Sequence, residues 1–385
     1  MTKTILATLL LLPLLAATGA YSQTRAGTEN QLQRVVTQQF LASFADRLEA
    51  RLKNRSVGYS FTVAGGSGNL MVSRAGGDAR RAPDTSARKM SVDDKFNVAS
   101  VSKTVTAAAV MRLLTEKGVN VDQPVHKYLP SSWTLGPNFD TVTFRELLTH
   151  RAGIRCDGEV TYDNLKACVA AGINPRTKSQ QLYNNSNYAL FRFIIPRLNG
   201  YPITPIKIDE SKLSAIYAKL YADYVKQNVF APIGLNGIDL KPVLTNPGLA
   251  YQYPSPAQAG DSFGDMTETS ASRGWNMSSK QLAMFLHNLL YTEKILPRAV
   301  SQRMKKEQLG LWKADVTDPA VLDYEHGGYY PGKDKQGNVF NKGEMNTLIA
   351  NFPNGVNVAI IVNSQFGPGM SIADAARAAM KETLK

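Results

Sequence analysis

The chain has 385 residues and a formal net charge of +13, from 44 lysines and arginines against 31 aspartates and glutamates. The basic residues are scattered and are not interleaved with aromatic residues in runs, so no nucleic-acid partner is expected. The length fits one large enzyme domain with a helical insertion, or two domains.

The N-terminal segment is typical of a secretory signal peptide. Lys3 precedes an apolar run from Ile5 to Ala17, and small residues follow up to Ser22. That run is too short to span a bilayer, and no later run is long enough. We therefore expect residues 1–22 to be removed and residues 23–385 to be exported, periplasmic or secreted, without a stable membrane anchor.

The first elements of the mature chain are a helix and a hairpin. Apolar residues at helical spacing predict an amphipathic helix that ends at Leu52 and includes Leu32, Val36 and Phe44. Alternating residues 57–63, a glycine-rich turn and residues 70–73 then predict an antiparallel hairpin.

The C-terminal end repeats this combination. Residues 346–352 and 356–362 flank Pro353-Asn354-Gly355, which predicts a second hairpin. An alanine-rich helix is predicted over 372–384, with Ser371 as its N-cap.

Helices are predicted between these ends. Ser278 and Gln281 form a capping box before an apolar stripe, and residues 187–198 and 213–229 are further helix candidates. Strands and helices at both ends with helices between them indicate a mixed layer built from both termini and an inserted helical region.

Cys156 and Cys168 are the two cysteines. A close pair in one loop of an exported protein is expected to form a disulfide. Metal binding by two cysteines without a nearby histidine is not expected, and neither is any cofactor.

A serine and a lysine three residues apart open the apolar run that begins at Thr104. If this run is a helix, the Lys103 amine lies close to the Ser100 hydroxyl and can activate it as a nucleophile. The free backbone N–H groups of the helix N-terminus would favour a developing oxyanion. A second copy of the pattern, Ser86 and Lys89, lies in a polar segment and is expected to be a loop.

Tyr183 and Asn185 precede another apolar run. The Tyr183 phenol could pass a proton to or from the nucleophile, and a nearby lysine cation would push it towards its anionic form. The Asn185 amide could hold Lys103 and a substrate carbonyl. A second tyrosine in a similar pattern, Tyr162, lies inside the expected disulfide loop and ranks lower, and His150 is expected to fix a turn.

His326, Gly327 and Gly328 lead into Tyr329. The two glycines would allow another backbone or a ligand to approach a strand edge closely. A substrate could lie along that edge, with the N–H groups of Tyr329 and Ser100 forming an oxyanion hole.

A different hydrolase pattern is also present. Gly260-Asp261-Ser262-Phe263-Gly264 matches the nucleophile elbow of alpha/beta-hydrolases, and Asp323 and His326 follow in the chain order of a triad. The segments around Ser262 lack the strand and helix that an elbow requires, which disfavours this alternative.

The order of three motifs resembles that of beta-lactamase-like serine hydrolases, a group with class C beta-lactamases, D-alanyl-D-alanine carboxypeptidases, D-aminopeptidases and esterases. The motifs are Ser100-Val101-Ser102-Lys103, Tyr183-Asn184-Asn185 and His326-Gly327-Gly328. Lesser similarities lie at 147–154, 272–285 and 352–355, so the resemblance covers about residues 30–385.

The resemblance implies an α/β fold of the α+β type, in which an antiparallel sheet is flanked by helices and an all-helical subdomain is added. The sheet part would comprise about 28–95 and 300–385, and the helical part about 100–295. The resemblance also implies that Ser100 is the acyl-accepting nucleophile, that Lys103 is the general base or proton relay, and that Tyr183 is a second base. Asn185 would support them, and His326 to Tyr329 would form the strand edge and oxyanion hole.

The third motif departs from the Lys-Thr-Gly of most beta-lactamases in this group. Histidine is mostly neutral at pH 7, so His326 is a poorer anchor for a substrate carboxylate. We therefore expect an esterase or D-amino-acid peptidase acting on a small-molecule or peptide substrate. The alternatives are a class C-like beta-lactamase and a catalytically inactive envelope binding protein.

Overall fold

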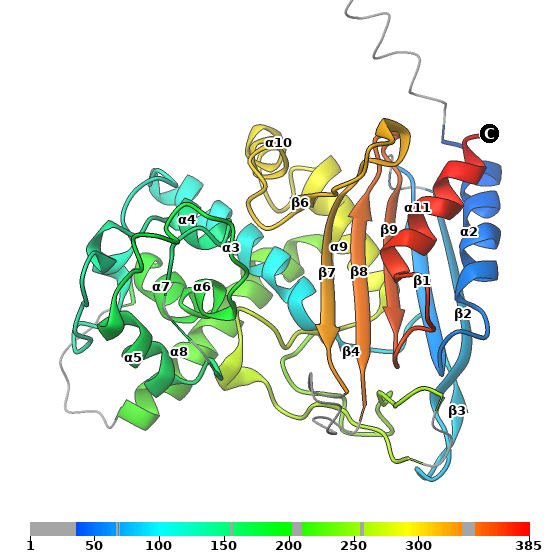
Figure 1. Cartoon of the computed structure of the whole chain (residues 1–385), viewed down its shortest axis with the longest axis horizontal. Helices are drawn as coiled ribbons and strands as arrows, with labels where there is room; N and C mark the ends of the chain where they lie inside the picture. Colours follow the sequence, from blue (N-terminus) through cyan, green and yellow to red (C-terminus); the bar gives the residue numbers. More distant parts are fainter. Residues whose placement is uncertain are drawn as a thin grey trace, which may run out of the picture. The chain divides into compact units, whose positions relative to one another are not determined.

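An antiparallel sheet built from both ends of the chain is the framework of the fold (Figure 1). Its strand order is β3-β2-β1-β9-β8-β7-β6, so the N-terminal and C-terminal hairpins meet where β1 pairs with β9. The strands are β1 (Gly58–Ala64), β2 (Met71–Arg80), β3 (Arg88–Lys89), β6 (Trp312–Lys313), β7 (Tyr324–Tyr330), β8 (Met345–Asn351) and β9 (Asn357–Val362).

This computed structural model describes residues 36–385 except 67, 69, 155, 157, 202–209, 255–257 and 333–342. The expected signal peptide, residues 1–22, lies outside the described residues. Within them, no helix combines the length and the apolar character needed to cross a bilayer.

Both predicted hairpins are confirmed. Strand β2 runs on to Arg80, beyond the predicted end at Ser73, because backbone pairing with β1 continues through polar and glycine residues. Gly76 lies opposite Tyr59, and a β-carbon there would be 2.4 Å from the Tyr59 hydroxyl oxygen. Glycine therefore makes room for a cross-strand tyrosine at a position beyond the predicted end of the strand.

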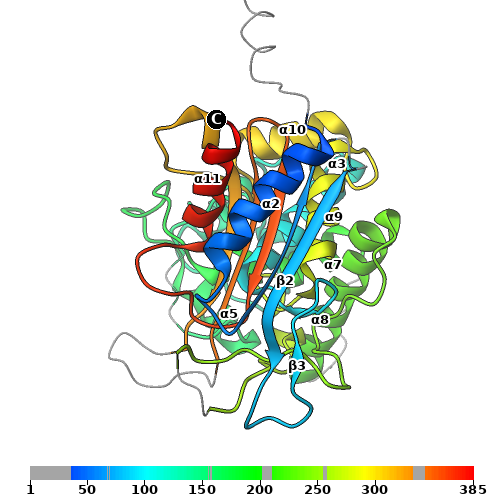
Figure 2. The same ribbon diagram turned by 90° about the vertical axis from the view of Figure 1, so that its right-hand side faces the viewer.

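Helices α2 (Gln38–Leu52) and α11 (Ile372–Thr383) cover one face of the sheet and pack against each other (Figure 2). The part of the predicted first helix that precedes residue 36 lies outside the described residues. The N-cap at Ser371 is confirmed, since its hydroxyl accepts a hydrogen bond from Asp374 N–H.

Helix α9 (Ser279–Tyr291) packs on the sheet at β1 and β9, and its predicted capping box is present. Alternate β9 side chains face two cores: Val358 and Ile360 join that of α2 and α11, and Ala359 and Ile361 join that of α9. Because both faces of β9 are covered, its sequence is continuously apolar from Val358 to Val362.

The remaining α-helices include the inserted helical region. The candidate at 187–198 is present but begins earlier and is divided in two, and the candidate at 213–229 continues as a π-helical turn, Lys226–Phe230. These helices are α3 (Ser102–Lys117), α4 (Phe144–Leu148), α5 (Tyr162–Ala171), α6 (Asn185–Ala189), α7 (Phe191–Leu198), α8 (Glu210–Val225) and α10 (Arg298–Lys306).

The expected fold class, an antiparallel sheet flanked by helices with an added helical part, is confirmed. The boundaries proposed for the two parts stay a prediction. Helix α9 falls within the range expected for the helical part, yet it packs on the sheet.

Candidate active site

Ser100 lies in a 3-10 turn, Ala99–Val101, that leads directly into α3. The short strand β4 (Phe96–Asn97) pairs with β5 (Asn276–Met277) and fixes the entry to this turn. Ala99 adopts a positive φ of 47°, an unfavourable conformation for alanine, and its N–H donates to Asn97 Oδ1 over 3.0 Å. The competing serine, Ser86, lies exposed in a turn, as expected.

The Lys103 amine is fully buried and holds three oxygen atoms around it. Its Nζ lies 3.0 Å from Ser100 Oγ, 2.8 Å from Asn185 Oδ1 and 2.8 Å from the backbone oxygen of Ser272. The last two atoms can only accept hydrogen bonds, so a neutral amine satisfies both with its two protons. Its lone pair is then left for the Ser100 hydroxyl proton.

The electrostatic surroundings favour this neutral amine. Burial lowers the Lys103 pKa well below its usual value, and the nearby Arg273 cation lowers it further. A neutral lysine can accept a proton, so the site contains a base beside the serine.

Tyr183 completes the contacts of the serine oxygen. Its hydroxyl lies 2.6 Å from Ser100 Oγ and 3.4 Å from Asn185 Oδ1. Burial raises the Tyr183 pKa to about 12, although the hydrogen bond to Ser100 and the Arg273 cation oppose the change. The expectation of a phenolate is therefore wrong for this structure: with lysine neutral, the tyrosine keeps its proton at neutral pH.

His150 positions Tyr183. Its Nδ1 accepts a hydrogen bond from the N–H of Asn184 over 3.1 Å, and its ring stacks on the Tyr183 ring at 4.6 Å between centroids. Burial lowers the His150 pKa to about 2, so the ring is neutral. Trp312 packs edge-on against both rings.

The predicted close approach at the double glycine is present. A β-carbon on Gly328 would lie 2.5 Å from Val98 O and 3.2 Å from Ala99 Cβ, so glycine lets β7 contact the segment before Ser100. Strand β6 pairs only with Tyr324 and Glu325, which leaves residues 326–330 beyond its reach.

His326 does not offer a cation to a substrate. Its side chain is buried, its Nδ1 lies 2.7 Å from Gly327 O, and its ring packs on Trp312. Burial lowers the His326 pKa to about 3, so the ring is neutral. Tyr329, by contrast, is 54% exposed on the same strand.

Sequence reasoning missed Ser272 and Arg273. Ser272 acts through its backbone oxygen, which no side-chain pattern can reveal. Arg273 forms an ion pair with Glu159, a residue of the disulfide loop. Trp312 was also missed, because its role is visible only once the rings of His150 and His326 are brought together.

The alternative nucleophile elbow has no support. Ser262 lies in an irregular segment without the flanking strand and helix, and Asp323 is ion-paired with Arg377 at 3.0 Å. Tyr162, the less favoured candidate for the catalytic tyrosine, is buried and accepts a hydrogen bond from Trp133. The predicted disulfide between Cys156 and Cys168 is present.

The chain belongs to the Beta-lactamase family, whose sequence model matches residues 44–384. It is 30% identical over 145 residues to PbpX of Bacillus subtilis (strain 168), named as a penicillin-binding protein, covering 36% of this chain and 31% of that protein. It is 29% identical over 110 residues to the teichoic acid D-alanine hydrolase of Staphylococcus aureus, covering 27% of each chain. The matches therefore span about a third or less of the curated relatives.

A similar fold occurs in the crystal structure of a beta-lactamase/D-alanine carboxypeptidase from Yersinia pestis. The TM-score is 0.67 at 16% identity, with 90% of this chain and 98% of that chain covered. At this identity the likeness concerns the fold.

Proposed function

We propose that this protein is a serine hydrolase that cleaves an ester or amide through an acyl-enzyme on Ser100. One observation carries the proposal: Ser100 Oγ is within hydrogen-bonding distance of both Lys103 Nζ and Tyr183 Oη. This is the geometry of an activated nucleophile, in which a base is itself oriented by further groups.

In acylation, Ser100 Oγ attacks the substrate carbonyl carbon and its proton passes to the neutral Lys103 amine. Asn185 Oδ1 and Ser272 O orient that amine, so its lone pair is aimed before substrate arrives. The carbonyl oxygen becomes an oxyanion, which the N–H groups of Ser100 and Tyr329 would bind.

Collapse of the tetrahedral intermediate breaks the bond to the leaving alcohol or amine. Tyr183 donates its proton to the departing oxygen or nitrogen and regains one from Lys103 through the contacts around Ser100 Oγ. The raised pKa of Tyr183, about 12, keeps the phenol protonated for this task. In deacylation the same groups work in reverse: they take a proton from water, which attacks the acyl carbonyl and releases Ser100.

The substrate we propose is an ester or a D-amino-acid amide. Two relatives are named for D-alanine chemistry, a hydrolase acting on teichoic acid and a carboxypeptidase, which supports this choice. A beta-lactam is the less favoured alternative, because the neutral, buried His326 stands where the usual motif has lysine.

We also propose that the protein is exported after removal of residues 1–22. The apolar run Ile5–Ala17 and the disulfide between Cys156 and Cys168 support this placement.

The test combines labelling with a substrate panel. We expect a fluorophosphonate to modify Ser100, and short-chain p-nitrophenyl esters or D-alanyl peptides to be hydrolysed faster than nitrocefin. Ser100→Ala should abolish both labelling and turnover, whereas Ser262→Ala should retain both. Folded protein that shows no adduct on Ser100 would support the inactive binding protein instead.

A further inference from the structure

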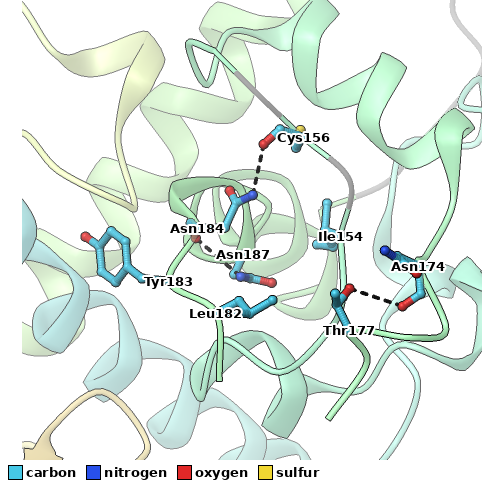
Figure 3. A pocket seen from close by; sticks show the side chains of 9 residues that line it. Ile154, Cys156, Asn174, Thr177, Leu182, Tyr183, Asn184 and Asn187 are labelled. Carbon is cyan, nitrogen blue, oxygen red and sulfur yellow. Dashed lines mark hydrogen bonds between the residues drawn. The ribbon is translucent and has the colours of Figure 1, made fainter. Parts of the chain in front are cut away.

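A pocket lies beside Tyr183, whose hydroxyl points away from it (Figure 3) and lies 2.6 Å from Ser100 Oγ. It has a volume of about 430 Å³ and lies between the disulfide loop and the segment that carries Tyr183. The described residues that line it bear no charged side chain; they are Gly153, Ile154, Cys156, Asn174, Thr177, Leu182, Tyr183, Asn184 and Asn187.

Asn187 provides an unused hydrogen-bond acceptor in this pocket. The side chain is 2% exposed, and none of the described residues donates to its amide oxygen. Its orientation is fixed, because the amide nitrogen donates to Asn184 O, a group that can only accept. Figure 3 shows the oxygen directed across the pocket, towards Ile154 and Thr177.

Thr177 adds a second acceptor to the pocket, and Asn174, whose Oδ1 accepts from Arg176 N–H, adds an amide donor. Thr177 donates its hydroxyl proton to Asn174 O and keeps its lone pairs for a ligand, while the Asn184 amide nitrogen is engaged by Cys156 O. A buried acceptor without a donor is unfavourable, so the pocket suits a neutral ligand that brings hydroxyl groups. Ile154 and the half-exposed Leu182 supply apolar surface for its carbon skeleton.

We propose that this pocket binds the alcohol part of the substrate, and that this alcohol is a neutral polyol or sugar. The inference rests on the proposed function: Tyr183 donates a proton to the leaving group, so the leaving group lies at Tyr183 and can extend past its ring. The pocket would thus select esters of hydroxyl-rich alcohols over esters of apolar ones.

The experiment compares two esters that differ in the hydroxyls of the alcohol, glucose 6-O-butyrate and cyclohexylmethyl butyrate. We expect kcat/KM to favour the glucose ester by about tenfold, the effect of one or two net hydrogen bonds, mainly through KM. Thr177→Phe fills the pocket and Leu182→Trp narrows it from an exposed position, so both should remove the preference. Thr177→Ser keeps the hydroxyl and the space and should retain it.

Ethyl butyrate, too small to reach the pocket, separates this inference from the proposed function. If wild type hydrolyses ethyl butyrate but shows no preference for the glucose ester, or if both obstructing variants keep the preference, the pocket assignment is wrong. If no ester is hydrolysed, saturation-transfer NMR with methyl glucoside still decides. A signal in wild type that is lost in Thr177→Phe supports the pocket, and no signal in wild type overturns it.

Discussion

Replacing Asn185 with aspartate should disable the base without changing the shape of the site. The substitution puts a carboxylate where the amide oxygen now lies, 2.8 Å from Lys103 Nζ. The new charge would stabilise the ammonium form of Lys103 and so raise its pKa, against the lowering that burial and Arg273 produce.

The size of this effect follows from Coulomb's law. Two opposite charges about 4 Å apart attract by about 4 kcal/mol at the effective dielectric constant of a protein site, and this is about a thousandfold change in the protonation equilibrium. Desolvation of the new carboxylate would reduce that figure. Because the reaction needs neutral Lys103, activity should be lost at neutral pH and return as the pH is raised.

The assay is kcat/KM for a p-nitrophenyl ester from acidic to alkaline pH, which reports the free enzyme's essential groups. We expect the acidic limb of the Asn185→Asp profile to move to higher pH, while Asn236→Asp, an exposed change of the same charge, leaves it in place. An equal loss of rate at every pH, with the limb unmoved, would show that protonation of Lys103 does not control the reaction.

Three further predictions follow from the same geometry. Lys103→Arg puts a permanently charged guanidinium where the neutral amine lies and cannot act as a base, so acylation measured by stopped flow should fall at least a hundredfold; unchanged turnover would make the lysine purely structural. Gly328→Ala would put a β-carbon 2.2 Å from a neighbouring hydroxyl oxygen, so it should lower the free energy of unfolding in urea by about 1–3 kcal/mol. Gly327→Ala is the control, because its β-carbon would have only one atom within 4 Å and should be tolerated. Equal losses of stability in the two variants would contradict this reasoning. Reduction of the Cys156–Cys168 disulfide, which spans 12 residues, should lower stability by about 3 kcal/mol, and an unchanged Tm in dithiothreitol would argue against that contribution.

The Ser100–Lys103 pair was predictable because it is local in sequence, whereas Tyr183, 83 residues further on, was predicted from the order of the motifs. The spacing of Ser100 and Lys103 before an apolar helix, and the chain order with Tyr183, are patterns that the structure brings together. The sequence also predicted the two hairpins and the caps at Ser278 and Ser371, since turn and capping residues act over a few positions.

What escaped prediction depends on long-range contacts. The third oxygen atom that contacts the Lys103 amine is the backbone oxygen of Ser272, which the pairing of β4 with β5 brings near. The protonation states of Lys103 and Tyr183 depend on burial, which motif spacing does not reveal, so a protonated phenol was not predicted. Similarly, α9 looked like a member of the helical region because periodicity does not say which surface covers an apolar stripe.

The pairing of β1 with β9 has a consequence for biosynthesis. Strand β1 is synthesised early, but its neighbour β9 is complete only once Val362 has been added. Helix α2 likewise packs on α11, which is synthesised last. Contacts of such large sequence separation form slowly and only after most of the chain is available. A chain cut before Asn357 would lack the middle of its sheet, so the surroundings of Ser100, the proposed nucleophile, would be complete only when synthesis is nearly finished.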